Sequence, residues 1–349
     1  MNRPILIVLT PVFNEAWILP AFLKATSLWA DYIIIADQMS TDGTREIIAD
    51  FAKRQSDVLC MMSDVLDDYT KHHHCEVIMI DNPRKEMHQA ATRRLLFEEA
   101  KKIKGDKILF TLDADEFLSG DFPKTEGWKT IMNSEPGDVF CFRWMNLSAD
   151  ATKYSTWQPY YWALHVDKDS FNGEFPDNFI HEWRLPWPTQ EKHVYTIDDI
   201  CFIHFARVNK IRQRNKARFY QISQSAAVDK YSGISFYRMY HPVVDEVLYD
   251  VPEDAYAFYR NHNLNLYANI NLDDSGQHYT DGVLRRIHEK GIRYFHKLDI
   301  WDEDFLRQEK LVDPRTWFDK LVHKYLRRTN KWAKSFFVHV VDYLMKKVY

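Results

Sequence analysis

Short apolar runs alternate with helical periodicity over the first 112 residues, and this alternation restricts the fold more than any other feature. Residues 5–9 and 32–36 are continuous apolar runs, which is typical of strands buried on both faces. Residues 16–29 between them carry apolar side chains at helical spacing, and a further helix is expected over about 45–54. Strands and helices that alternate through short connections predict a parallel sheet with right-handed crossovers.

The same pattern continues beyond residue 54. Apolar runs over 58–62 and 77–80 are candidate strands, a long helix is expected over about 84–104, and a strand over 107–112. The sequence therefore predicts an α/β fold with a mixed, mainly parallel sheet flanked by helices. In open sheets of this kind, ligands bind beyond the carboxyl ends of the strands.

The pattern changes after residue 138. Shorter and more aromatic strands, such as 139–147 and 200–205, are separated by loops rich in Pro and Trp, which favours mixed or antiparallel pairing. From residue 210 onward the periodicity is mostly helical. We expect one domain over 1–220 and a helical C-terminal region over 221–349 that ends in a basic amphipathic helix.

Three acids follow one of the predicted strands. In the stretch LFTLDADEFLS, residues 109–119, Asp113, Asp115 and Glu116 fall within four positions. A helix cap is the alternative use of such acids, but a cap needs one acid. Three carboxylates at one strand end repel one another, and we expect only solvent or a cation to relieve this repulsion.

Composition excludes several classes of protein. A hydrophobic content of 46% over 349 residues is enough for a substantial core, and a net charge of -4 does not favour nucleic acid as a partner. The four cysteines lie far apart without C-x-x-C spacing, so we expect a reducing compartment and neither a zinc ribbon nor a disulfide framework. No 18 uninterrupted apolar residues occur, and the N-terminal apolar run reads as a strand that ends near Pro11, not as a signal peptide. A cytoplasmic protein is expected.

Four motifs lie at predicted strand ends, in a fixed order. They are TPVFNE at 10–15, ADQMSTDGT at 36–44, DADE at 113–116, and CFIHF at 201–205, which precedes a basic helix. Together they resemble the family 2 glycosyltransferases with the Rossmann-like GT-A fold, over roughly residues 1–220. The resemblance implies a metal-dependent, inverting enzyme that transfers a sugar from a nucleotide-sugar donor to a saccharide or lipid-linked saccharide acceptor. Members of this type serve bacterial surface-polysaccharide assembly.

The resemblance also implies a metal site. The second aspartate of the family's acidic motif, here Asp115, coordinates the ion, the first, Asp113, lies near the ribose, and His204 completes metal and diphosphate binding. Mg²⁺ and Mn²⁺ prefer oxygen ligands, Mn²⁺ also accepts imidazole, and either ion stabilises a departing diphosphate as a Lewis acid. For His204, a hydrogen-bonded core histidine is the alternative.

The donor nucleotide is expected at the first two strand ends. Pro11 and Glu15 match the family's opening motif, and Asp37 matches the aspartate that faces the nucleoside. Gln38 stands where many members have an acid that reads uracil, so the base stays open. We expect residues 41–44 to be architectural, because they cap a helix and turn the chain.

An arginine of the next helix is expected to support this site. The segment AATRR, residues 90–94, resembles the family's A-R-N helix start, and Arg94 is the preferred residue. Arg93 is adjacent, and a solvent-exposed salt bridge is the alternative use of either side chain.

A carboxylate base must take the proton from the attacking hydroxyl in an inverting transfer. The family usually supplies an E-D pair, which this chain lacks, and the segment NFIHEW, residues 178–183, resembles a variant with H-E. Glu182 is therefore the candidate base, with His181 as support, Asp177 as the rival and an ordinary loop acid as the alternative. His72, His73 and His74 predict a solvated loop, because consecutive strand side chains face opposite ways.

The last 35 residues carry nine Lys or Arg against two Asp, with Trp and Phe at helical spacing. A basic amphipathic helix of this kind suits an anionic membrane surface, although packing on the protein or in a dimer is the alternative. For the chain as a whole, a non-catalytic nucleotide-sugar binder and a sugar-phosphate nucleotidyltransferase remain the competing functions. The second usually needs a Gly-rich phosphate loop near the first strand, where this chain has residues 11–15.

Overall fold

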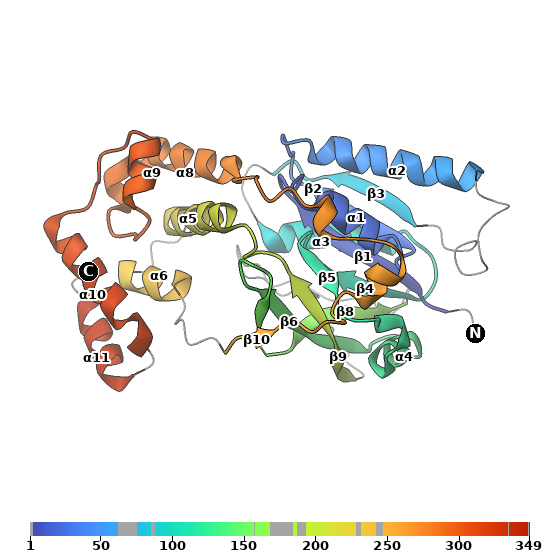
Figure 1. Cartoon of the computed structure of the whole chain (residues 1–349). Coiled ribbons are helices and arrows are strands. Elements are labelled where there is room, and N and C mark those ends of the chain that lie inside the picture. The colour runs from blue at the N-terminus through green and yellow to red at the C-terminus, as the bar shows by residue number, and fades with distance from the viewer. Residues whose placement is uncertain are drawn as a thin grey trace. The chain divides into compact units, whose positions relative to one another are not determined.

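The computed structural model describes residues 3–61, 75–84, 88–156, 158–167, 184–186, 193–227, 232–241, 247–333, 335–347 and 349 (Figure 1). The chain forms two compact units. The first comprises Met1–Val208 and Leu248–Asp273, and the second comprises Asn209–Val247 and Asp274–Tyr349. The expected domain boundary after residue 220 stays a prediction. The first compact unit differs from the expected first domain because it also includes residues 248–273.

One sheet organises the first unit. Four of its strands are parallel neighbours in the order β4 (Lys107–Thr111), β1 (Ile5–Val12), β2 (Tyr32–Asp37) and β3 (Glu76–Asp81). Their carboxyl ends therefore meet at one edge, as the alternating pattern predicts. The candidate strand over 58–62 was wrong, because α2 (Thr44–Met61) continues through residue 61. A short apolar run does not distinguish a strand from the last turns of a helix.

The other half of the sheet is mixed, as expected. The strand β8 (Tyr160–Val166) is antiparallel to β4 and to β6 (Val139–Leu147). The long strand β9 (Val194–His204) runs parallel to β6 and antiparallel to β5 (Glu116–Leu118). The order is completed by β7 (Lys153–Thr156) and β10 (Tyr249–Asp250), so ten strands of the described residues form one sheet.

Both faces of the parallel strands β1, β2 and β4 are buried. In β1, Leu6 and Val8 belong to one apolar cluster, whereas Ile7 and Leu9 belong to another. Helix α1 (Leu19–Thr26) buries Phe22 in the first cluster, and α3 (Gln89–Lys101) buries Phe97 in the second. The helix α4 (Glu126–Met132) begins at Thr125, whose hydroxyl accepts from the Trp128 N–H. This burial on both faces explains the continuous apolar runs.

Residues 248–273 pass over the first unit as a strap. The strap contains β10, α7 (Ala257–Asn261) and a 3₁₀ turn, η3 (Tyr267–Asn269). The N–H of Gly120 donates to the carbonyl of Ala255 at 2.8 Å, and the N–H of Asn271 donates to the carbonyl of Trp17 at 2.7 Å. The strap is thus tied to the chain just after β5 and to the start of α1.

The second unit is helical. Its helices are α5 (Lys210–Ala227), α6 (Gly233–Tyr240), α8 (Gln277–Lys290), α9 (Glu303–Gln308), α10 (Trp317–Thr329) and α11 (Phe336–Met345). Gly282 lets α8 approach α5, because a Cβ there would lie 2.5 Å from the Phe219 ring. The tail is two helices and not one, since the short turn η5 (Asn330–Trp332) follows α10 and Ser335 caps α11. Among the described residues, no helix combines the length and the apolar character needed to cross a membrane.

Candidate active site

The loops after β1 and β2 are fastened together at the carboxyl edge of the sheet. Asn14 is buried and left-handed, with φ at 55°, a conformation that asparagine tolerates better than most residues. Its N–H donates to Ser40 Oγ at 2.8 Å, and its Oδ1 accepts from the Thr41 N–H at 2.7 Å. The asparagine of the opening motif therefore supports the second motif directly.

The threonine and aspartate of the turn complete this connection. Thr44 Oγ1 accepts from the Glu15 N–H at 2.9 Å, and Asp42 accepts from the Ala16 N–H at 3.0 Å. Glu15 in turn accepts from Trp17 Nε1 at 2.6 Å. Thr44 and Asp42 thus connect the two loops, which is the structural role expected of residues 41–44. Pro11 lies at the end of β1, paired in register with Ala36 of β2.

Asp37 is fully buried at the end of β2. Its carboxylate forms an ion pair with Arg45 at 2.5 Å and accepts from the Ser40 N–H at 3.2 Å. Gln38 is partly buried, and its Nε2 donates to the carbonyl of Arg84 at 3.0 Å. The nucleotide-binding parts expected of Asp37 and Gln38 stay predictions.

Glu116 is the most enclosed of the three clustered acids, with no exposed surface. Both terminal nitrogens of Arg184 donate to it, at 2.7 and 2.8 Å. Trp144 Nε1 donates at 2.8 Å, and the Asp113 N–H at 2.9 Å. Since its charge is paired and its oxygens are occupied within the protein, Glu116 belongs to the scaffold.

Arg184 also reaches Asp113 and the end of β4. Its Nη2 lies 2.9 Å from Asp113 Oδ2, and its Nη1 donates to the carbonyl of Thr111 at 3.0 Å. The guanidinium lies over the Trp162 ring at 5.0 Å. Burial opposes its charge, but the facing carboxylates of Asp113 and Glu116 outweigh burial and raise the pKa of Arg184. This buried cation is an essential part of the cluster that the sequence did not reveal.

A second arginine pairs with Asp113. Arg93 Nη2 lies 2.8 Å from Asp113 Oδ1, and the Arg93 side chain is buried. Arg94 is exposed, so the ion pair to the acidic motif is made by its neighbour, and a role for Arg94 stays a prediction. The cation that was expected to relieve the repulsion among the acids is, for Asp113 and Glu116, an arginine side chain. Arg93 and Arg184 pair with Asp113, and Arg184 pairs with Glu116.

Asp115 and His204 face each other beside this cluster. Asp115 is buried, and its Oδ1 lies 3.6 Å from His204 Nε2. His204 Nδ1 lies 2.7 Å from Asn146 Oδ1, an atom that only accepts, so Nδ1 donates this hydrogen bond while Nε2 faces Asp115. The imidazole stacks on Trp144, with centroids 5.4 Å apart and planes at 16°. These two contacts fix the orientation of the His204 ring.

This pair fits a divalent cation. Adjacent ligands of an octahedral ion, each at about 2.1 Å, lie about 3 Å apart, which a small shift from 3.6 Å provides. A ligating histidine typically donates its other N–H to a fixed oxygen, which Asn146 supplies here. Within the described ranges, no cluster of three or more His, Cys, Asp or Glu forms a potential metal site. Asp115 and His204, the two predicted metal ligands, are thus brought together by the fold, and their binding of an ion stays a prediction.

The candidate base lies outside the described residues. Glu182, His181 and Asp177 belong to the undescribed range 168–183, and His72, His73 and His74 belong to the undescribed range 62–74. The described cysteines Cys75, Cys141 and Cys201 are free thiols.

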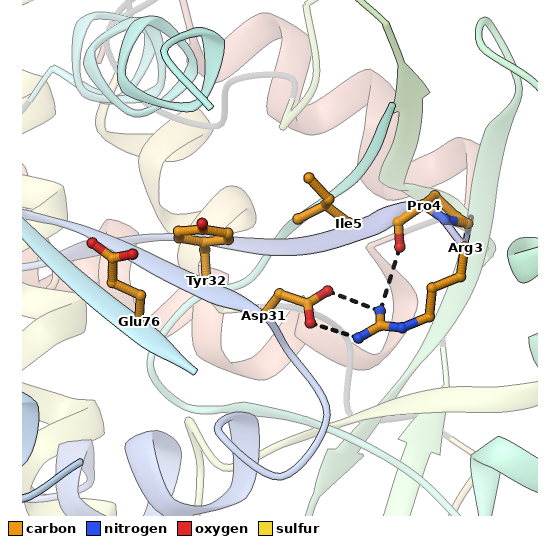
Figure 2. Close-up of a pocket in the computed structure, with 6 residues that line it drawn as sticks. All are labelled: Arg3, Pro4, Ile5, Asp31, Tyr32 and Glu76. Carbon is orange, nitrogen blue, oxygen red and sulfur yellow. Dashed lines mark hydrogen bonds and ion pairs between the residues drawn. The ribbon is translucent and has the colours of Figure 1, made fainter. Parts of the chain in front are cut away.

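A separate hollow lies at the opposite edge of the sheet. Figure 2 shows it at the amino ends of the strands, where Ile5 begins β1, Tyr32 begins β2 and Glu76 begins β3. An ion pair between Arg3 and Asp31 at 2.6 Å closes one side. The three acids, His204 and the connected loops after β1 and β2 all lie at the carboxyl ends of strands. This hollow is therefore not part of the candidate active site.

A model of the glycosyl transferase family 2 matches residues 7–208. The match runs from β1 through β9 and includes the loops after β1 and β2, the acidic cluster and His204. The family match and the fold together define a glycosyltransferase with a GT-A fold that uses a nucleotide-sugar donor. The chain belongs to glycosyl transferase family 2. The predicted family, fold class and enzyme class are confirmed.

Solved structures resemble the chain only distantly. A mannosyltransferase from Pyrobaculum calidifontis in complex with GDP-Man and Mn²⁺ is 12% identical, with 83% of this chain and 75% of that one covered and a TM-score of 0.39. Residues 1–349 of S. aureus TarS are 11% identical, with 80% and 92% covered and a TM-score of 0.35. HddC from Yersinia pseudotuberculosis is 11% identical, with 58% and 94% covered and a TM-score of 0.32. No curated protein matches the chain.

Proposed function

We propose that this glycosyltransferase is metal-dependent and binds Mn²⁺ or Mg²⁺ through Asp115 and His204. The observation that carries the proposal is the position of His204 Nε2, which lies 3.6 Å from the Asp115 carboxylate on a ring that Asn146 orients. The neighbouring acids Asp113 and Glu116 are paired with arginines, whereas the carboxylate of Asp115 faces the His204 ring. When bound, the ion stabilises the leaving diphosphate as a Lewis acid.

The remaining residues of the carboxyl edge hold the nucleotide in this proposal. Asp113 keeps 39% of its side chain exposed despite two arginine partners, which suits a hydrogen bond to a ribose hydroxyl. The end of β1 with Pro11 and Glu15, and the end of β2 with Asp37 and Gln38, surround the nucleoside. Arg94 belongs to the same set, with an interaction to the nucleotide from the exposed side of α3.

An inverting transfer is the proposed stereochemical course. Glu182 takes the proton from the acceptor hydroxyl, and it lies two positions before Arg184 in the chain. Arg184 itself is fixed to Asp113 and Glu116. The acceptor is a saccharide or a lipid-linked saccharide, which suits bacterial polysaccharide assembly.

Donor hydrolysis tests the metal-dependent transfer, because water replaces an unknown acceptor. UDP-, GDP- and dTDP-sugars are incubated with the protein and Mn²⁺, and release of the nucleoside diphosphate is measured. We expect EDTA to abolish turnover. Asp115→Asn should lower turnover at least about a hundredfold, because it removes a metal ligand. Asp198→Asn serves as the matched control, since Asp198 is an exposed acid of the same unit, 3.6 Å from Arg143. Turnover that persists in EDTA or in Asp115→Asn, or donor binding without turnover, contradicts the proposal.

Peripheral membrane contact through α10 and α11 is part of the proposal. Exposed aromatic side chains support it, since Trp317 is 77%, Phe336 82% and Phe337 81% exposed. Exposed cations accompany them on the same helices and the flanking residues, namely Lys324, Arg328, Lys331, Lys346 and Lys347. Aromatic rings beside cations suit an anionic lipid surface.

Vesicle flotation tests the membrane contact. Vesicles of phosphatidylcholine with phosphatidylglycerol should carry the protein, whereas vesicles of phosphatidylcholine alone should not, and salt should weaken binding. Phe336→Ser combined with Phe337→Ser should abolish flotation. Val312→Ser, at a position 83% exposed in the same unit, should not. A double variant that floats like the wild type rules this contact out.

A further inference from the structure

The strap of residues 248–273 contains a pocket of its own. The pocket has a volume of about 390 Å³ and is lined by Tyr256, Arg260, Asn263, Leu264 and Tyr267, among others. This volume lies within the range of about 300–1,000 Å³ that is usual for small-molecule sites. All of these residues come from one short stretch of the first unit.

Two tyrosines supply neutral polar groups to the pocket. Their hydroxyl oxygens lie 3.1 Å apart, so one O–H donates to the other oxygen and the second O–H stays available. Burial raises the pKa of Tyr256 and of Tyr267, so both phenols remain protonated at neutral pH. The pair thus offers a donor and acceptors without a charge.

Asn263 adds an amide to the lining of the pocket. It is exposed and left-handed, with φ at 56°. Among the described residues, its side chain makes no hydrogen bond, while Arg260 beside it donates through Nη2 to the carbonyl of Glu253 at 2.7 Å. An unused amide in a pocket is suited to a ligand with neighbouring hydroxyl groups.

The pocket also has an apolar component. The rings of Tyr256 and Tyr267 meet edge to face with centroids 6.0 Å apart, and Leu264 lies beside them. The residues that line it include one cation and no carboxylate, which does not favour a diphosphate or a metal ion. Neutral donors and acceptors next to aromatic faces match a pyranose, which has hydroxyls at its rim and C–H groups on its faces.

Packing and hydrogen bonds connect the pocket to the candidate metal site. The Tyr267 ring packs on Phe205 with centroids 5.4 Å apart, and Phe205 directly follows His204. The N–H of Phe205 donates to the carbonyl of Asp115 at 2.9 Å. The Tyr259 hydroxyl donates to the carbonyl of Leu118 at 2.9 Å, which fixes the strap to β5. A ligand in the pocket is therefore held in a fixed relation to the metal-binding strand end.

From these contacts we infer that the strap pocket is a saccharide subsite that binds one pyranose unit of the acceptor glycan. The inference rests on the proposed function, because it takes the acceptor to be a glycan. It adds a binding determinant outside the family's motifs, in a segment that the sequence assigned to the C-terminal region.

Saturation-transfer NMR tests the subsite without donor or metal. The probes are methyl glycosides of glucose, mannose, galactose and N-acetylglucosamine. The wild type should transfer saturation to the ring C–H protons of at least one probe, and Tyr256→Phe or Asn263→Gly should weaken its binding about tenfold, as expected for one lost hydrogen bond. Glycine accepts the left-handed backbone of Asn263, and phenylalanine keeps the ring, so both variants should fold.

Lys310→Gly is the matched control for glycine at a left-handed position, since Lys310 has φ at 53° in the other unit. It should bind the probe like the wild type. The subsite is refuted if no probe binds, or if both pocket variants bind like the wild type. The proposed function is tested separately, by hydrolysis of nucleotide-sugars by the wild type. Failure of the proposed function is therefore distinguishable from failure of the saccharide subsite.

Discussion

At the scale of single residues, Arg184 explains how three acids share one strand end. It pairs with Asp113 and Glu116 and donates to the carbonyl of Thr111, so two of the three charges are compensated before any ligand binds. A lone arginine in a loop carries no sequence pattern that identifies its partners. The acidic cluster was therefore predictable from the sequence, but its buried counter-charge was not.

Replacing Arg184 by methionine should destabilise the first unit strongly. The variant leaves the fully buried Glu116 without its cation, and removal of one partner of a buried pair costs about 3–5 kcal/mol. Lys124→Met is the control, because Lys124 is 77% exposed and forms only a surface pair with Asp121. It should change the free energy of unfolding by less than about 1 kcal/mol. Urea unfolding of both variants measures the difference, and equal effects would contradict the account of Arg184.

His165 should make stability depend on pH. Burial lowers its pKa below 6.5, the usual value, because the charged ring loses solvent, while its Nδ1 contacts Ser134 Oγ at 2.8 Å. The unfolded chain therefore binds the proton more tightly, and the contribution of His165 is fully present above about pH 6.5 and is lost as the pH falls below it.

The measurement compares urea unfolding of the wild type and His165→Gln between pH 7.5 and 5. The wild type should lose more stability on acidification, by up to about 1.4 kcal/mol per pH unit for this one proton. Burial also lowers the pKa of His323 and of the partly buried His241, and both contribute to the two proteins equally. Parallel pH profiles for the two proteins would show that His165 does not titrate in this way.

At the scale of elements, the sheet edge was the most predictable part of the molecule. Apolar runs located β1, β2 and β4, and parallel strands necessarily bring their carboxyl ends together, so the motifs that follow them were expected to meet. The prediction of a strand over 58–62 was wrong, because an apolar run of five residues has the same pattern in a helix and in a strand. Side-chain partners across the sheet, such as Asn146, were not predictable because they depend on the register of β6 against β9.

Asn146 is expected to be a positioning residue for His204. The two are partners in the register of β6 and β9, and the hydrogen bond from His204 Nδ1 to Asn146 Oδ1 orients the ring so that Nε2 faces Asp115. Asn146→Ala should weaken Mn²⁺ binding about 10–100-fold, whereas Asn146→Asp, which keeps an accepting oxygen, should retain most of it. Titration of Mn²⁺ followed by electron paramagnetic resonance measures the affinity. An alanine variant with wild-type affinity would refute the role, and thermal melting separates it from loss of folding.

At the scale of the whole molecule, the strap shows that the first unit is discontinuous in sequence. Phe258 packs on Phe122 with ring centroids 4.4 Å apart, and Tyr259 lies 6.3 Å from Phe117. Periodicity alone assigned these residues to a helical C-terminal region, because a local pattern does not reveal which unit a segment packs against. The two-unit division thus depends on contacts far apart in the chain.

Truncation tests the place of the strap. A chain that ends at residue 220 lacks Phe258 and Tyr259, so Phe117 and Phe122 lose buried apolar contacts worth a few kcal/mol. A chain that ends at residue 273 keeps them. We expect a cooperative melt for the longer chain and a much lower melting temperature, or aggregation, for the shorter one. Equal melting of both chains would contradict the assignment of the strap to the first unit.

The central claim is that Asp115 and His204 share one divalent ion. Crystals grown with Mn²⁺ and the nucleoside diphosphate that binds, measured at the manganese absorption edge, test it most directly. The account predicts one anomalous peak within about 2.0–2.3 Å of both the Asp115 carboxylate and His204 Nε2, next to the diphosphate. Diphosphate density without a manganese peak at these two side chains would contradict it.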